Sequence, residues 1–143
     1  IAAIPIAFSF MPLLSGLSGN IGNQSTTIIV RGFYTGEVDQ QKKAKILTHE
    51  ILTSLMIGLT CALITGLLSF YIYQNLTLSF LIGTSLVLSM MLAVILGTLT
   101  PIFFRHFNLD PATASGPLIT TGIDIISFFV YLTLITKFIT ELV

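Results

Sequence analysis

Charge is scarce in this sequence of 143 residues. Only 8% of its residues are Asp, Glu, Lys or Arg, whereas a soluble domain carries about 25% of them. The few charges are clustered, which leaves apolar runs of about 20 residues or more, long enough to cross a hydrocarbon core as helices. With 54% hydrophobic residues and a mean hydropathy of +0.98, the composition indicates a polytopic, all-α membrane protein.

Other absences exclude whole classes of function. Acidic and basic residues balance to a net charge of zero, which argues against a nucleic-acid partner. The one cysteine, Cys61, excludes an intramolecular disulfide. No HExxH, GxSxG, CxxC or phosphate-loop motif is present, so nothing in the sequence indicates an enzyme. The chain begins at Ile1 without a basic, cleavable leader, and we expect it to be a domain excised from a longer membrane protein.

The apolar runs predict a bundle of about four membrane helices, which cover residues 5–33, 50–73, 78–104 and 111–138. Basic residues concentrate in the connections 31–49 and 105–110, which a four-pass topology places on one side of the membrane. The positive-inside rule makes that side cytoplasmic. We therefore expect a multi-pass integral membrane protein, located in the inner membrane if the source is bacterial.

Asp124 is the most informative single residue of the apolar runs. It follows Pro111 by 13 residues, which places it about 20 Å from the start of the predicted helix, well inside the hydrocarbon. An ionised carboxylate facing lipid at that depth costs several kcal/mol, so it should face a cavity, a bundle interior or a cation. Thr120 and Thr121 share its helical face. The structural alternative is a protonated aspartate hydrogen-bonded to a neighbouring helix.

The stretch "SGLSGNIGNQSTT" (15–27) interrupts the first apolar run with glycines, amides and hydroxyls. Gly19 and Asn20 lie roughly 17 Å from the end marked by Arg31, close to the expected depth of Asp124. One interpretation is that glycines allow close packing and amides join helices. The other is a hydrophilic path, because amide and carbonyl oxygens suit Mg²⁺ or its water shell.

Two motifs resemble those of the MgtE magnesium channels and transporters, to which solute carrier family 41 is related. "PLLSGLSGNIGNQSTTIIVRG" (12–32) is similar to that family's second membrane helix, and "DPATASGPLITTGIDIISFFVYL" (110–132) is similar to its last. The resemblance implies a homodimer with five membrane helices per subunit, of which this chain holds the last four, without the first helix and the cytoplasmic regulatory domains. It also implies a pore on the dimer axis, lined by the segments 5–33 and 111–138.

The resemblance assigns roles to particular residues. Asp124 corresponds to the pore aspartate that recognises hydrated Mg²⁺, with Gly19 and the carbonyl near Thr120 around the same site. The expected lining of the path is Gly22, Asn20, Asn23, Thr26 and Thr121.

The sequence therefore predicts a Mg²⁺ channel or transporter that works down the electrochemical gradient, with a second copy of itself, Mg²⁺ and membrane lipid as partners. Mn²⁺ and other divalent cations are alternative substrates. A Na⁺- or H⁺-coupled exchanger and a non-transporting membrane scaffold are the alternative functions.

Overall fold

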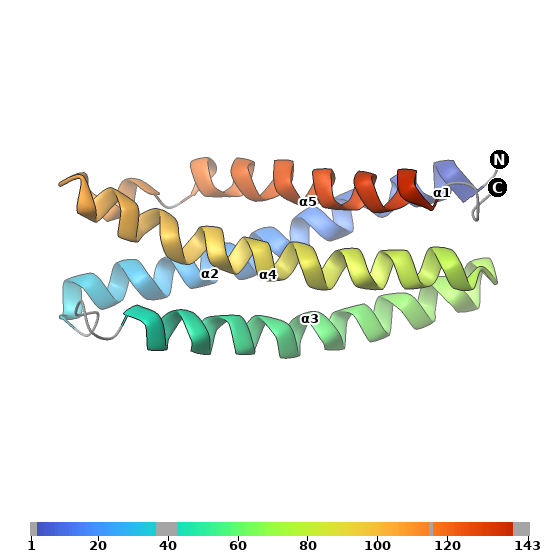
Figure 1. The fold of residues 1–143 in the computed structure, drawn as a ribbon, viewed down its shortest axis with the longest axis horizontal. Coiled ribbons are helices and arrows are strands. Elements are labelled where there is room, and N and C mark those ends of the chain that lie inside the picture. The colour runs from blue at the N-terminus through green and yellow to red at the C-terminus, as the bar shows by residue number, and fades with distance from the viewer. Residues whose placement is uncertain (1–2, 37–42, 115, 139–143) are drawn as a thin grey trace.

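The computed structural model describes residues 3–36, 43–114 and 116–138, and within them it is all-helical. Four long helices lie side by side along one direction (Figure 1). The elements in chain order are α1 (Ala3–Ser9), α2 (Met11–Thr35), α3 (Lys43–Tyr73), α4 (Leu76–His106), the short 3₁₀ helix η1 (Pro111–Ala114) and α5 (Pro117–Lys137). No strand occurs in these described ranges. The predicted all-α membrane helical bundle is confirmed.

Helix α4 is the centre of the bundle, and α2, α3 and α5 all pack against it (Figure 1). Its buried side chains come from every turn, from Leu78 and Ile82 near the start to Val94 further along. The face of α3 that points away from α4 is exposed and apolar, and it carries Met56, Leu63 and other large side chains. An apolar outer surface around a packed centre is what a bundle surrounded by lipid requires, because lipid tails replace water as the solvent.

Three of the described helices are both long and apolar enough to cross a membrane, and they comprise Lys45–Tyr73, Leu76–His106 and Pro117–Lys137. Helix α2 has 25 residues, which at 1.5 Å per residue is about 38 Å and also sufficient in length. It is not among the three because its polar stretch lowers its hydropathy. The least apolar long helix is therefore the one that carries the unusual motif.

Three of the expected helix boundaries were wrong. The second segment begins at Lys43 instead of residue 50. The first segment is not one helix from residue 5, since a break at Phe10 separates α1 from α2. The last does not begin at residue 111: a 3₁₀ turn comes first, and α5 begins at Pro117 after Gly116 at φ +81°. A positive φ interrupts the helical path and favours glycine, so Pro117 occupies the first helical turn, where its missing N–H costs nothing.

Helices α2 and α4 approach each other closely at a pair of glycines. A Cβ built on Gly97 would overlap the carbonyl oxygen of Gly22 and come within 3.1 Å of its Cα. The buried Thr26 hydroxyl lies 2.9 Å from the carbonyl oxygens of both Gly22 and Gly97. Small residues and interhelical hydrogen bonds are the usual means of joining membrane helices, and here they fix α2 against the central helix.

Candidate functional site

The candidate site is a seam between α2 and α5, formed by Ser15, Gly19 and Asn23 on one helix and Thr120 and Asp124 on the other. The Ser15 hydroxyl donates to Oδ1 of Asp124. Asn23 Nδ2 donates to Thr120 Oγ1 at 3.3 Å, and Gly19 faces the Thr120 methyl group. Ser15, early in α2, contacts Asp124, whereas Asn23, later in α2, contacts Thr120, which precedes Asp124 in α5. The two helices therefore run antiparallel here.

The spacing of these residues explains why they form one seam. Ser15, Gly19 and Asn23 recur every four residues, as do Thr120 and Asp124, and side chains four apart lie on one helical face. A Cβ added to Gly19 would lie 3.9 Å from the Thr120 methyl group, an ordinary contact distance, so this glycine faces α5 without being required by a close approach. The structure therefore places Gly19, Thr120 and Asp124 along the same α2–α5 contact.

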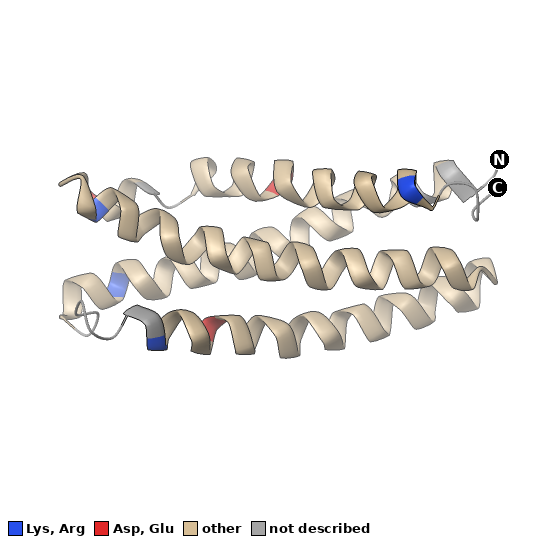
Figure 2. Cartoon of the chain, viewed as in Figure 1, with Lys and Arg blue, Asp and Glu red and all other residues tan. Residues whose placement is uncertain are grey.

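Asp124 is the only acidic residue of α5, and Figure 2 shows this acidic position in the middle of the helix. The residue is half-buried. The basic positions lie toward the helix ends, on α2, α3 and α4 at one end of the bundle and on α5 at the other (Figure 2). A carboxylate without a nearby cation in the apolar part of a bundle is expensive and marks an ion or substrate path in membrane proteins.

A single copy of the chain places few other metal-ligating side chains near the Asp124 carboxylate. In the described part of the chain, no group of three or more His, Cys, Asp or Glu side chains could hold a metal ion. The oxygen atoms at the seam are otherwise neutral, and one of them, the buried Asn23 Oδ1, accepts no hydrogen bond from any described residue. A cation at the seam would meet one carboxylate and several neutral oxygens per chain.

A row of exposed polar side chains borders the seam. Asn20, Gln24 and Thr27 project from α2, and Thr121 projects from α5. Unpaired amides facing hydrocarbon cost free energy, because lipid offers them no hydrogen bonds. This polar face, defined by those four residues, therefore requires water or another polar surface against it, unlike the apolar outer face of α3.

The structure places two of the expected path residues elsewhere. Thr26 and Gly22 are buried at the contact with α4, and Gly22 also faces the Ile123 side chain. They hold α2 in position and do not lie on the polar face. Asn20, Asn23 and Thr121 are exposed or half-buried and lie on or beside the polar face.

Sequence reasoning missed two polar residues that the fold uses. Ser15 was not among the expected site residues, although its hydroxyl donates a hydrogen bond to Asp124. Glu50 was given no role from the sequence, but it is only 9% exposed and accepts a hydrogen bond of 2.9 Å from buried Ser25. Its neighbour His49 is exposed and lies 3.8 Å from the Glu50 carboxylate. The signal for Ser15 was its position one helical turn before Gly19.

The loop before α5 is attached to the end of α2. Asp110 accepts hydrogen bonds of 2.9 Å from the backbone N–H of Ala112 and from the hydroxyl of Tyr34. The Ala112 N–H first, and then the Tyr34 hydroxyl, hold the pKa of Asp110 below its usual value, and the hydrogen bond to Asp110 raises the pKa of Tyr34. Nearby, the Arg105 guanidinium stacks 4.3 Å from the ring centre of Phe33. The first contact thus joins the end of α2 to the loop before α5, and the second joins the end of α2 to the end of α4.

Comparison with known proteins gives one consistent result. Residues 11–134 match the family model of MgtE, described as a divalent cation transporter. The magnesium transporter MgtE of Bacillus subtilis is 37% identical over 139 residues, which cover 97% of this chain and 31% of that protein. The magnesium transporter MgtE of Thermus thermophilus is 33% identical over 131 residues, which cover 92% of this chain and 29% of that protein. The chain thus spans less than a third of the length of these relatives.

Proposed function

The chain belongs to the MgtE family of divalent cation transporters, and from that premise we propose that it moves Mg²⁺ across a membrane along the polar face and seam of α2 and α5. The observation that carries the proposal is the half-buried Asp124 in the middle of a membrane helix, bordered by exposed amides and hydroxyls. A polar surface of this kind is unfavourable in contact with lipid, and it can bind the water shell of a hydrated ion.

We further propose that two copies of the chain face each other across this polar surface and form a symmetric homodimer. Each chain contributes one carboxylate, so a pore between two copies holds two Asp124 side chains. Their mutual repulsion is relieved better by one divalent cation than by Na⁺ or K⁺, because Coulomb energy scales with the charge of the ion. A closed two-fold arrangement is also the commonest symmetry of homo-oligomers.

The chemistry of the seam favours Mg²⁺ held through water. Mg²⁺ gives up its hydration shell reluctantly and prefers octahedral oxygen ligands. The hydroxyls of Ser15 and Thr120 and the amide oxygen of Asn23 can bond waters of that shell, while Asp124 supplies the charge. The seam suits Ca²⁺ less well than hydrated Mg²⁺, because Ca²⁺ takes six to eight oxygen ligands and a single carboxylate supplies few of them.

The driving force follows from the electrical potential of the membrane. An inward-negative potential contributes about 2.3 kcal/mol per charge per 100 mV, and about twice that for a divalent ion. Channel-type uptake then needs no second ion. We place the connections 31–49 and 105–110 in the cytoplasm on the positive-inside rule. A single cysteine introduced at Asn108 in a Cys61→Ala background should react with a membrane-impermeant reagent only from the cytoplasmic side, and reaction only from outside would reverse this orientation.

The test is Mg²⁺ flux into liposomes that contain the full-length protein. We expect Asp124→Ala and Asp124→Asn to reduce flux to the background of empty liposomes, since both remove the charge. Thr133→Val is the matched control on the same helix, because the exposed Thr133 hydroxyl bonds only within α5, to the carbonyl oxygen of Phe129. Unchanged flux in both Asp124 variants would refute the assignment of the site.

The same assay separates the alternatives. Flux that requires a Na⁺ or proton gradient would replace the channel by a coupled exchanger, in which Asp124 binds the two ions alternately. A folded protein that conducts no divalent cation under any gradient would favour a scaffold, in which the seam only joins α2 to α5.

A further inference from the structure

A groove opens on the outside of the bundle between the first turns of α4 and the last turns of α5, far along the helices from the seam. Its volume is about 570 Å³, within the range of ~300–1,000 Å³ typical of ligand pockets. Leu81 and Leu134 form its apolar wall, and Phe138 closes one side. The one charged lining group is Lys137, whose side chain is exposed.

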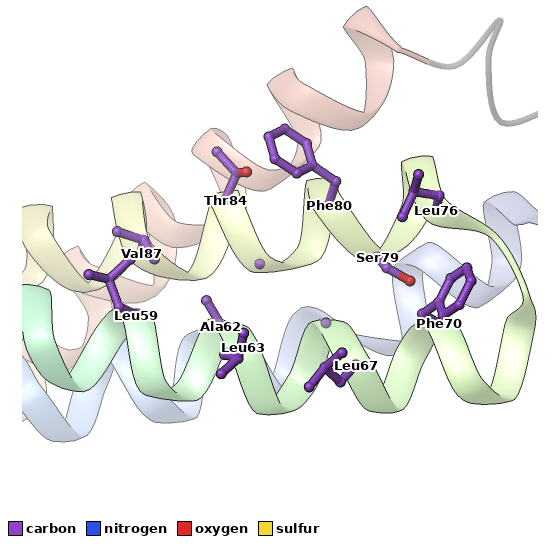
Figure 3. Close-up of a pocket in the computed structure, with 12 residues that line it drawn as sticks. Leu59, Ala62, Leu63, Leu67, Phe70, Leu76, Ser79, Phe80, Thr84 and Val87 are labelled. Atoms are coloured by element: carbon purple, nitrogen blue, oxygen red, sulfur yellow. The ribbon is translucent and has the colours of Figure 1, made fainter.

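This groove continues into a second one between α3 and α4. The second groove has a volume of about 600 Å³ and is lined mainly by aliphatic side chains. Leu76, Phe80 and Thr84 line both grooves. Figure 3 shows Phe80 and Thr84 rising from α4 toward α5, while Leu63 and Leu67 come from α3. The two grooves form one extended apolar surface that crosses α4.

We propose that an anionic phospholipid binds in this continuous groove, with its phosphate at Lys137 and an acyl chain along Phe80 and Thr84. The charge distribution supports a lipid over an apolar protein helix, because a single ammonium group lies at one end of a lining that is otherwise uncharged and mainly apolar. Lys137 is in the last turn of α5, and Leu76 is the first residue of α4. Both helix ends belong at the boundary of the hydrocarbon, the depth at which a lipid phosphate lies.

The surroundings of Lys137 favour a negatively charged headgroup. In the described part of the chain, neither the first half of α4 nor the second half of α5 contains an Asp or Glu. The Lys137 Nζ lies 6.0 Å from the centre of the Phe138 ring, so the ammonium stays next to the groove. The positive charge of the ammonium attracts an anionic phosphate on either side of the membrane, and the aliphatic stem of lysine can lie along apolar surface while the ammonium reaches the headgroup.

The test is native mass spectrometry of the full-length protein with phosphatidylglycerol or phosphatidylcholine of identical acyl chains. We expect several-fold more phosphatidylglycerol adduct on the native protein, and equal, lower binding of both lipids to Lys137→Gln. Lys45→Gln is the matched control, because Lys45 is an exposed lysine at the opposite end of the bundle and lines neither groove. This variant should keep the preference.

A second variant tests the acyl chain separately. Thr84→Phe fills the point that both grooves share, so it should reduce the retention of both lipids while the helical circular dichroism stays unchanged. Equal binding of the two lipids by the native protein, or a phosphatidylglycerol preference that survives Lys137→Gln, would overturn the proposal. A crosslink from Phe80 to another protein segment that persists with lipid present would also overturn it, by assigning the groove to that segment.

Discussion

Replacing Gly97 by alanine should damage the contact that holds α2 against α4. The added Cβ would overlap the carbonyl oxygen of Gly22 and lie 3.0 Å from its carbonyl carbon. These are backbone atoms, so no change of side-chain rotamer relieves the overlap, and the helices must separate. Overpacking of this kind costs about 1–3 kcal/mol, while alanine gains about 0.5–1 kcal/mol over glycine in a helix. The expected net loss of stability is about 0–2.5 kcal/mol, with a central value of about 1 kcal/mol.

The assay is unfolding of the detergent-solubilised protein by a denaturing detergent, followed by circular dichroism. Gly58→Ala is the matched control on the α3–α4 contact, where a Cβ would meet its nearest neighbours at 3.6 and 3.7 Å, ordinary contact distances. That variant should be as stable as the native protein or slightly more so. A Gly97→Ala protein as stable as Gly58→Ala would refute the reasoning.

A companion variant separates the overlap from the hydrogen bond at the same contact. Thr26→Val keeps the shape of the side chain and removes the hydroxyl that reaches the Gly97 carbonyl oxygen. The loss should be about 1 kcal/mol, the typical net value of one hydrogen bond. Because Thr26 is buried against α4, we expect Mg²⁺ selectivity to be unchanged. Altered selectivity in Thr26→Val would instead support its earlier assignment to the path.

Two further predictions concern polar contacts away from the seam. Glu50→Ala should destabilise the protein by about 1–3 kcal/mol, because it leaves the buried Ser25 hydroxyl without its acceptor, whereas Glu50→Gln retains an acceptor and should lose less; equal losses in the same unfolding assay would contradict this. Tyr34→Phe should raise the pKa of Asp110 toward its usual value, but not fully, since the Ala112 N–H still donates. The lowered pKa means that these hydrogen bonds stabilise the fold above the usual Asp pKa and are lost as the pH falls through the lowered value. Carboxyl NMR titration of Asp110 would show the rise, and an unchanged titration would exclude Tyr34 as a cause.

Hydropathy was sufficient to predict three of the four long helices, because lipid-facing segments are apolar and must satisfy their backbone groups within themselves. Helix α2 is less apolar and was predicted from the apolar residues on either side of its polar stretch. Where a helix starts depends on local backbone geometry that hydropathy does not report. The start of α5 moved from Pro111 to Pro117 because Gly116 adopts a positive φ. Both prolines are compatible with the first turn of a helix, so the sequence left the choice between them open.

The residues of the seam were predicted in part, for a different reason. The motif identified α2 and Asp124, but it did not distinguish the face of α2 toward α5 from the face toward α4. Thr26 and Asn23 are three residues apart, and yet one bonds the central helix and the other bonds Thr120. That division depends on how α2 is rotated, which the glycine contact at Gly97 determines. Glu50 was missed because burial of a charged residue depends on a partner 25 positions away.

The modest hydropathy of α2 has a consequence for how the protein is made. A segment enters the bilayer from the translocation machinery on its own only if its apolar side chains outweigh its polar ones. Helix α2 is synthesised before α3, α4 and α5, and its polar side chains find partners on all three: Glu50 on α3, the Gly97 carbonyl on α4, and Thr120 and Asp124 on α5. We expect α2 to wait beside the translocation channel until α4 and α5 emerge. Insertion of this chain is then a joint event of several helices, and substitutions in α5 should affect how α2 enters the membrane.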